Sequence, residues 1–141
     1  MPVGRLDMYT SGALILTNDG DFVYKLTHPK HEITKTYTVT LKGMVSDEEI
    51  EVLRNGVKIE ENFVTSPAKV RKIKEDIENN KTRLEIVIHE GRNRQVRKMC
   101  EKIGKHVLAL HRSKIGDIDL KNLKIGNWRF LTEKEVESLL K

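Results

Sequence analysis

The stretch KTYTVTL, Lys35 to Leu41, decides how this 141-residue chain folds. Threonine occupies every second position, and tyrosine, valine and leucine occupy the positions between. Side chains alternate between the two faces of a strand, so one face would be polar and the other apolar. β-branched and aromatic residues are also the types that strands favour. The stretch therefore predicts a half-buried β-strand with one face in a core.

The residues after this strand predict a helix and then a hairpin. Ser46 and Glu49 form a capping-box pattern at the start of SDEEIEVLRNGV, a predicted helix that Gly56 ends. Residues 65–75 and 82–91 read as two strands joined by the polar turn DIENNK. Both strands would add to the sheet that the first strand begins.

The clearest predicted helix is RNRQVRKMCEKIG, residues 92–104. It carries an apolar stripe at helical spacing, formed by Val96, Met99, Cys100 and Ile103. Arg97 flanks this stripe, about 100° around the helix from Val96, whereas Arg94 and Lys98 lie further toward solvent. An arginine at the edge of a buried stripe either projects into a pocket, where it would hold a carboxylate ionised, or belongs to a solvated basic face.

The two ends of the chain supply the remaining elements. The apolar run ALILTN ends in the turn signal NDG, and DFVYKLTHP predicts a short helix that stops near Pro29. HVLALHRSKIGDIDL predicts a strand pair or bent strand, and LTEKEVESLL predicts a last helix with a capping box of Thr132 and Glu135. Helices and strands interleave irregularly. We therefore predict one domain, residues 1–141, of the α+β class, with a mixed, mostly antiparallel sheet and flanking helices.

Charge and composition limit the classes of partner that this chain is expected to bind. The net charge is +5, and it is uneven: residues 1–70 hold 8 Lys/Arg against 10 Asp/Glu, whereas residues 71–141 hold 18 against 11. A basic half suits a polyanion such as nucleic acid, and equally a lysine-rich solvated surface. No apolar stretch approaches the roughly 20 residues that a bilayer requires, so no membrane partner is expected. The single cysteine favours a reduced, cytoplasmic compartment.

Several constellations that carry chemistry do not occur in the sequence. It has no glycine-rich phosphate loop, GxSxG, HExxH or close Cys/His cluster, so we expect no cofactor and no metal, and a dinucleotide- or phosphate-binding enzyme is disfavoured. Cys100 lies on an apolar stripe and reads as a core thiol. Asp7, Tyr37 and Arg97 remain as candidates for chemistry. Their plainer interpretations are a turn residue or helix cap, a core aromatic and a surface cation.

Four motifs, read together, favour chemistry. GRLDMYTSGALILTNDG, KTYTVTL, EGRNRQVRKMCEKIG and LHRSKIGDIDLKNLKIGNWRFLTEKEVESLL follow one another in this order. In that combination the chain, from about Pro2 to its C-terminus, resembles the bacterial ribosomal-RNA pseudouridine synthases of the RsuA/RluB/RluF type. The resemblance implies the catalytic core of those enzymes. Ala13 departs from the family, which more often has leucine there, and this should affect packing rather than chemistry.

The resemblance also implies roles for individual residues. Asp7 would be the catalytic aspartate, and Tyr37 would pack against the target uracil and is a candidate for proton abstraction. Arg97 would pair with the aspartate, with Arg94 as its rival. We expect RNA contacts from Arg5, Lys35, Arg92, Asn93, Arg94, Gln95, Lys98 and Arg112. The implied reaction turns a uridine of a ribosomal-RNA stem-loop into pseudouridine with no cofactor and no metal. The alternative is a non-catalytic RNA-binding or ribosome-assembly module on the same fold.

The position of the aspartate near the start of the chain raises a further expectation. In the family that the chain resembles, more of the catalytic domain, including a KP segment, precedes the aspartate, and usually an S4-type RNA-binding domain precedes that. We therefore expect an N-terminally truncated catalytic domain that is weakly active or inactive alone. Apolar surface left uncovered by the missing strands would favour self-association.

Overall fold

The computed structural model describes residues 1–28 and 30–141. The helices are α1 (Gly20–Thr27), α2 (Asp47–Asn55), α3 (Gln95–Lys102) and α4 (Glu133–Leu140). The longer strands are β4 (Lys35–Lys42), β7 (Lys69–Asp76), β8 (Lys81–Ile88) and β9 (Val107–Ile115). The short strands are β1 (Pro2–Val3), β2 (Thr10–Gly12), β3 (Ile15–Leu16), β5 (Lys58–Glu60), β6 (Phe63–Val64) and β10 (Ile118–Asp119). Among the described residues, no helix is long and apolar enough to cross a membrane.

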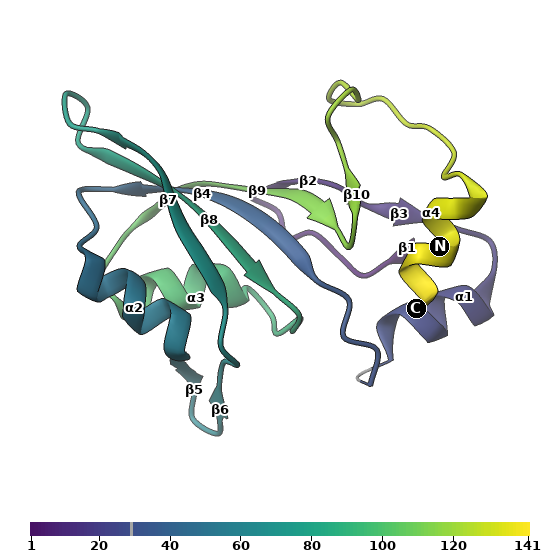
Figure 1. Ribbon diagram of the computed structural model, residues 1–141, viewed down its shortest axis with the longest axis horizontal. Coiled ribbons are helices and arrows are strands. Elements are labelled where there is room, and N and C mark those ends of the chain that lie inside the picture. Colours follow the sequence, from purple (N-terminus) through teal and green to yellow (C-terminus); the bar gives the residue numbers. More distant parts are fainter. Residues whose placement is uncertain (29) are drawn as a thin grey trace.

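The main sheet has its strands in the order β10-β9-β4-β8-β7, and β2 pairs with β9 beside this path. Every pairing along the path is antiparallel, whereas β2 runs parallel to β9. The predicted α+β class with a mixed, mostly antiparallel sheet is therefore confirmed. In Figure 1, α2 and α3 lie under one half of the sheet, and α1 and α4 lie at the other end.

The core of the described residues consists of two hydrophobic clusters, one in each half of the molecule. The first joins β4 and β8 to α2 and α3, with Val39, Leu53, Leu84 and Met99 fully buried. The second joins the N-terminal strands to α1 and α4 through Ile15, Leu26, Ile115 and Leu139, among others. Each large apolar side chain buried in this way contributes about 1.5–3 kcal/mol to folding. The paired strands β4 and β9 extend through both halves and so connect the two clusters (Figure 1).

Most locally specified elements agree with the predictions. The capping boxes at Ser46 and Thr132 are both present, and β4 has the predicted apolar face. The apolar run ends before NDG as predicted, and Asp19 within NDG accepts hydrogen bonds from two backbone N–H groups and so caps α1. That helix ends at Thr27, and Pro29, which was predicted to stop it, lies outside the described residues.

The predicted helix over residues 92–104 is too long at both ends. α3 begins only at Gln95, because Arg94 has the left-handed backbone conformation, with φ of 53°. The arginine-rich segment before it is therefore a loop rather than a helix face. At the other end the helix stops at Lys102, and Gly104 follows with φ of +77°. A glycine with positive φ commonly follows the last turn of a helix and ends it.

Gly12 lets the N-terminal strand approach β9 closely. A Cβ at this position would lie 2.1 Å from the backbone oxygen of Arg112 and 2.6 Å from its nitrogen. These atoms belong to the strand backbone and have little freedom to move away. Gly12 also has φ of +124°, a backbone angle that residues other than glycine rarely adopt. The parallel β2–β9 pairing therefore depends on the absence of a side chain here.

We expect Gly12→Ala to lower the free energy of unfolding by more than the roughly 1–3 kcal/mol that a strained positive φ costs alone. Gly43→Ala is the matched control, because Gly43 also has positive φ, but a Cβ there would meet nothing within 4 Å. Urea denaturation followed by circular dichroism gives both values. Equal losses in the two variants would show that the close approach at β9 contributes nothing.

Candidate active site

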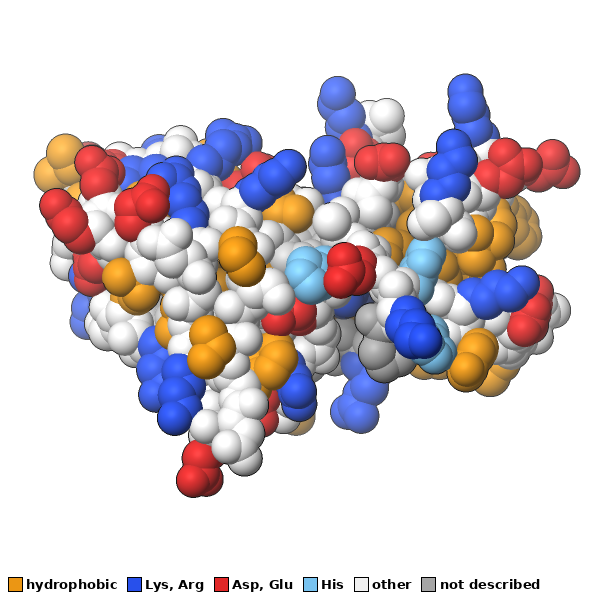
Figure 2. Space-filling model, turned by 60° about the horizontal axis from the view of Figure 1, so that its bottom comes forward, with side chains coloured by type: hydrophobic (Ala, Val, Ile, Leu, Met, Phe, Trp, Pro, Cys, Tyr) orange, Lys and Arg blue, Asp and Glu red, His pale blue; other side chains and the backbone are white. Residues whose placement is uncertain are grey.

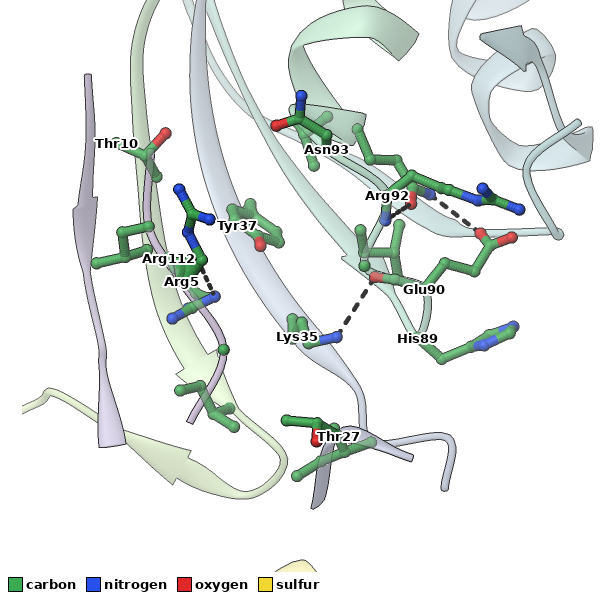
Figure 3. Close-up of a pocket in the computed structure, with 18 of the residues that line it drawn as sticks. Arg5, Thr10, Thr27, Lys35, Tyr37, His89, Glu90, Arg92, Asn93 and Arg112 are labelled. Atoms are coloured by element: carbon green, nitrogen blue, oxygen red, sulfur yellow. Dashed lines mark hydrogen bonds between the residues drawn. The ribbon is translucent and has the colours of Figure 1, made fainter. Parts of the chain in front are cut away.

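A cleft of about 890 Å³ lies between the two halves of the molecule, with β4 and β9 among the elements that line it. The GRLD segment, the loop after β8 and the first residues of α3 supply about half of its polar groups. Figure 3 shows Tyr37 and Lys35 on one strand, with Arg5 and Arg112 on one side of them and Glu90 and Arg92 on the other. The cleft therefore gathers segments that are far apart in the sequence.

Asp7 occupies a turn between β1 and β2. Its Oδ1 accepts hydrogen bonds from the Thr10 hydroxyl at 2.6 Å and from the Tyr9 backbone N–H at 3.2 Å. The Thr10 N–H also donates to the Asp7 carbonyl oxygen at 3.1 Å. An aspartate readily stabilises such a turn through its own side chain. One carboxylate oxygen is thus committed to the turn, and the turn fixes the direction of the other.

That second oxygen, Oδ2 of Asp7, faces two arginines from the start of α3. Arg97 Nε lies 3.6 Å away and Arg94 Nη1 lies 4.0 Å away. The Arg97 side chain is 9% exposed and that of Arg94 is 42% exposed, so Arg97 is the closer and more buried partner. Arg97 also donates from Nη2 to the Tyr9 carbonyl oxygen at 2.8 Å. The helix is therefore bound to the Asp7 turn through both charge and hydrogen bonding.

These contacts keep Asp7 ionised. Burial, the largest single effect, raises the pKa of its carboxyl, whereas the Thr10 hydroxyl and the charge of Arg97 lower it. The Tyr9 N–H and Arg94 also lower it, and the four contacts together outweigh burial, so the pKa lies below its ordinary value. The Asp7 contacts therefore stabilise the fold at pH values above the unfolded-state pKa of about 3.9. This contribution is lost as the pH falls through the lower pKa of the folded state.

Glu90 positions the loop that carries the arginines. Its carboxylate accepts hydrogen bonds from the backbone N–H and hydroxyl of Ser66, at 3.1 and 3.2 Å, and from the Gln95 amide at 3.0 Å. The Gln95 side-chain oxygen in turn accepts from the Arg92 backbone N–H (Figure 3). The end of β8, the segment after β6 and the start of α3 are thereby held together.

The residues expected to contact RNA fall into three groups. Arg5, Lys35, Arg92, Asn93 and Arg94 all line the cleft, and all of these except Lys35 are exposed. Gln95 and Arg112 also line it, but both are only 4% exposed and their polar groups bond within the protein. Arg112 donates to the carbonyl oxygens of Ala13 and Arg5. Lys98 is not among the lining residues.

Three of the cleft residues that sequence reasoning missed make contacts that shape the site. Thr10 follows Asp7 by three positions, a spacing at which a hydroxyl can bond to a turn aspartate, and this signal was available. Glu90 carried no such signal, because its partner Ser66 lies 24 residues away. Phe63 lies on the small β5–β6 hairpin, and the Arg92 guanidinium carbon lies over its ring, 4.1 Å from the ring centre. Nothing in the local pattern places that hairpin beside the cleft.

Comparisons with known proteins agree with this arrangement. A family model described as RNA pseudouridylate synthase matches residues 1–102. Ribosomal large subunit pseudouridine synthase B of Bacillus subtilis is 46% identical over 98% of this chain, and ribosomal small subunit pseudouridine synthase A of Escherichia coli is 39% identical over 97%. A crystal structure of a pseudouridylate synthase, 37% identical, superimposes over 98% of this chain and 58% of that chain with a TM-score of 0.86.

The chain therefore belongs to the RNA pseudouridylate synthase family. Within that family, its relatives place it with the synthases that are named for the large and small subunits of the ribosome. The chain spans 56% of the length of the B. subtilis protein and 58% of the E. coli protein.

We expect Thr10→Val and Arg97→Met each to raise the pKa of Asp7, because each removes a contact that favours the carboxylate. Thr38→Val is the control, since Thr38 lies on the other face of β4 from Tyr37. The pKa is measured by following the ¹³C shift of the Asp7 carboxyl through a pH titration. An unchanged pKa in both variants would contradict the assigned contacts.

Proposed function

We propose that this chain forms one catalytic domain that isomerises a uridine of ribosomal RNA to pseudouridine, with Asp7 as the catalytic carboxylate. The observation that carries the proposal is the geometry of Asp7, which has one oxygen bound in the turn and the other facing Arg97 and Arg94. A module that only binds RNA has no use for a recessed carboxylate, because a negative charge opposes RNA affinity.

The proposed reaction suits a single carboxylate. The N1–C1′ bond of uridine breaks, the base turns within the cleft, and a new bond joins C1′ to C5, which loses a proton while N1 gains one. No atom is gained, so the residues need only supply a nucleophile or base and hold the detached ring. Asp7 attacks either the ring or the sugar, or removes a sugar proton. Tyr37, half-buried on the cleft floor, offers its ring to the flipped base, and stacking of this kind contributes about 1–3 kcal/mol.

We also propose a stem-loop of ribosomal RNA as the partner and the cytoplasm as the compartment. The exposed arginines Arg5, Arg92 and Arg94 surround the cleft and suit the phosphates of a folded RNA. The target base must leave its stack to reach Asp7, at a cost of a few kcal/mol, and a loop lowers this cost. The relatives are named for the two parts of the ribosome, which supports a ribosomal RNA.

Asp7→Asn is expected to abolish isomerisation while the fold and RNA binding persist, because only the charge is removed. The measurement is tritium release from ribosomal RNA that carries 5-tritiated uridine, since bond formation at C5 displaces that hydrogen. Asp21→Asn is the matched control, because Asp21 is an exposed carboxylate on α1. Retained release in Asp7→Asn would overturn the catalytic assignment. No release from the unaltered chain and none from an N-terminally extended form of it, together with intact RNA binding, would favour the binding-module alternative.

We further propose that this chain associates with itself through exposed apolar surface at the end that carries α1 and α4. Leu16, Trp128 and Phe130 are 70%, 75% and 83% exposed. Figure 2 shows hydrophobic side chains gathered at this end of the molecule. Exposed apolar groups that lie together favour association because their burial releases ordered water.

The double variant Trp128→Ser/Phe130→Ser is expected to shift the chain toward the monomer in sedimentation velocity at micromolar concentration. Ile77→Ser is the control, because Ile77 is 78% exposed but lies in the turn between β7 and β8, at the other end of the molecule (Figure 1). A monomeric unaltered chain, or an equal shift in the control, would contradict association through this surface.

A further inference from the structure

Lys35 is a cation in the cleft without a counter-ion. It is half-buried, it lines the cleft, and its Nζ donates a hydrogen bond to the Glu90 carbonyl oxygen at 3.4 Å, close to the limit for such a bond (Figure 3). Within residues 1–28 and 30–141, no carboxylate lies within 4.0 Å of that nitrogen. An ammonium has three protons to donate. Most of its hydrogen-bonding capacity is therefore available to a molecule in the cleft.

The surroundings of Lys35 make this charge costly to the free protein. Burial and then the positive charge of Arg112 lower the pKa of Lys35 below its ordinary value. Gly91 faces the ammonium, and a Cβ there would lie 3.4 Å from Nζ, so glycine leaves the nitrogen room. A buried charge of this kind is normally paired. An anionic ligand would remove the penalty, and this suggests that the cleft binds negative charge beside Lys35.

The proposed reaction generates such a charge. When the N1–C1′ bond breaks, its electron pair remains with the uracil ring and spreads over the ring nitrogens and carbonyl oxygens. C1′, which loses that pair, either bonds to the Asp7 carboxylate or has its charge cancelled by loss of a sugar proton to Asp7. If Asp7 instead adds to the ring first, the electrons of the attacked double bond move onto a ring carbonyl. Each route therefore places negative charge on the uracil.

We propose that the Lys35 ammonium contacts the uracil ring and stabilises the negative charge that develops on it, so that the detached base stays in the cleft until C5 bonds to C1′. This inference rests on the proposed function and adds to it a residue that acts on the base. A donor that is already in place where charge develops stabilises the transition state more than the ground state.

The position of Lys35 favours the base over a phosphate. Lys35 and Tyr37 are two residues apart on β4, so they share one face of the strand and their Cα atoms lie about 7 Å apart. A uracil stacked on Tyr37 would present its edge to the neighbouring ammonium. The exposed Arg5, Arg92 and Arg94 are better placed for phosphates, because the backbone of a flipped nucleotide remains toward solvent.

The test compares Lys35→Met and Lys35→Gln with Lys35→Arg, and uses Lys42→Met as the matched control. Lys42 lies at the far end of the same strand, is exposed and does not line the cleft. Steady-state kinetics use 5-tritiated ribosomal RNA, and chromatography of RNA labelled in its uracil rings detects free uracil. Circular dichroism melts show whether each variant folds, and the Gln and Arg variants keep the test decisive where Lys35→Met does not fold.

We expect the neutral variants to lower kcat by about 10²-fold with KM within a few-fold of the unaltered value. We also expect them to release free uracil, and Lys35→Arg to restore part of kcat. A raised KM with unchanged kcat would mean that Lys35 binds a phosphate and would overturn the proposal, as would unchanged kinetics without free uracil. Tritium release that persists in Asp7→Asn, or is absent both from the unaltered chain and from its N-terminally extended form, would instead reject the proposed function, and this inference with it.

Discussion

Arg97 holds together two parts of the chain that lie far apart in the sequence, and the shape of the cleft depends on it. Its guanidinium bonds to the Tyr9 carbonyl and faces the Asp7 carboxylate, while its helix is buried against the sheet. A guanidinium buried to this extent is unfavourable without a nearby anion, and a carboxylate in the same place is unfavourable without a cation. Each group therefore makes the burial of the other acceptable. Removing either the guanidinium or the carboxylate would leave the other charge partly buried without its partner.

Arg97 has one further property that is relevant to chemistry. Its Nε is buried and has no hydrogen-bond partner in the part of the chain that the structure describes, because the Asp7 oxygen lies 3.6 Å away. Catalytic hydrogen bonds are often long in free enzymes and shorten when substrate binds. A small movement of the Asp7 turn toward α3 would complete this bond. The free site is thus close to, but not at, its most favourable geometry.

The local elements could be predicted from the sequence because their signals are local. The alternation in β4 and the capping residues Ser46 and Thr132 act within a few positions, and the structure agrees with them. The helical periodicity also placed Arg97 at the edge of a buried stripe. The start of α3 could not be predicted, because it depends on the left-handed Arg94 and on the Glu90 network, which involves Ser66. Spacing within the helix carries no information on either.

The burial of Arg112 could not be predicted from the sequence either, because its hydrogen-bond acceptors are carbonyl oxygens about 100 residues earlier in the chain. An arginine in a basic segment looks like an RNA contact until the strand that supplies those oxygens is known. The same difficulty applies to Gln95, whose amide bonds only within the protein. The candidate chemistry at Asp7, Tyr37 and Arg97 was predicted from the order of four motifs. The structure places Asp7 and Tyr37 in one cleft, and Arg97 faces the Asp7 carboxylate from α3.

The place of β9 in the sheet has a consequence for the order in which the molecule assembles. This strand pairs with both β4 and the short β2, yet it follows β4, β7 and β8 in the sequence. The pairs β4–β8 and β7–β8 need only residues up to Ile88, so they can form before β9 joins the sheet. Contacts of such long sequence separation form late. Asp7, although it comes before all of these longer strands in the sequence, is therefore among the groups that reach their final position late.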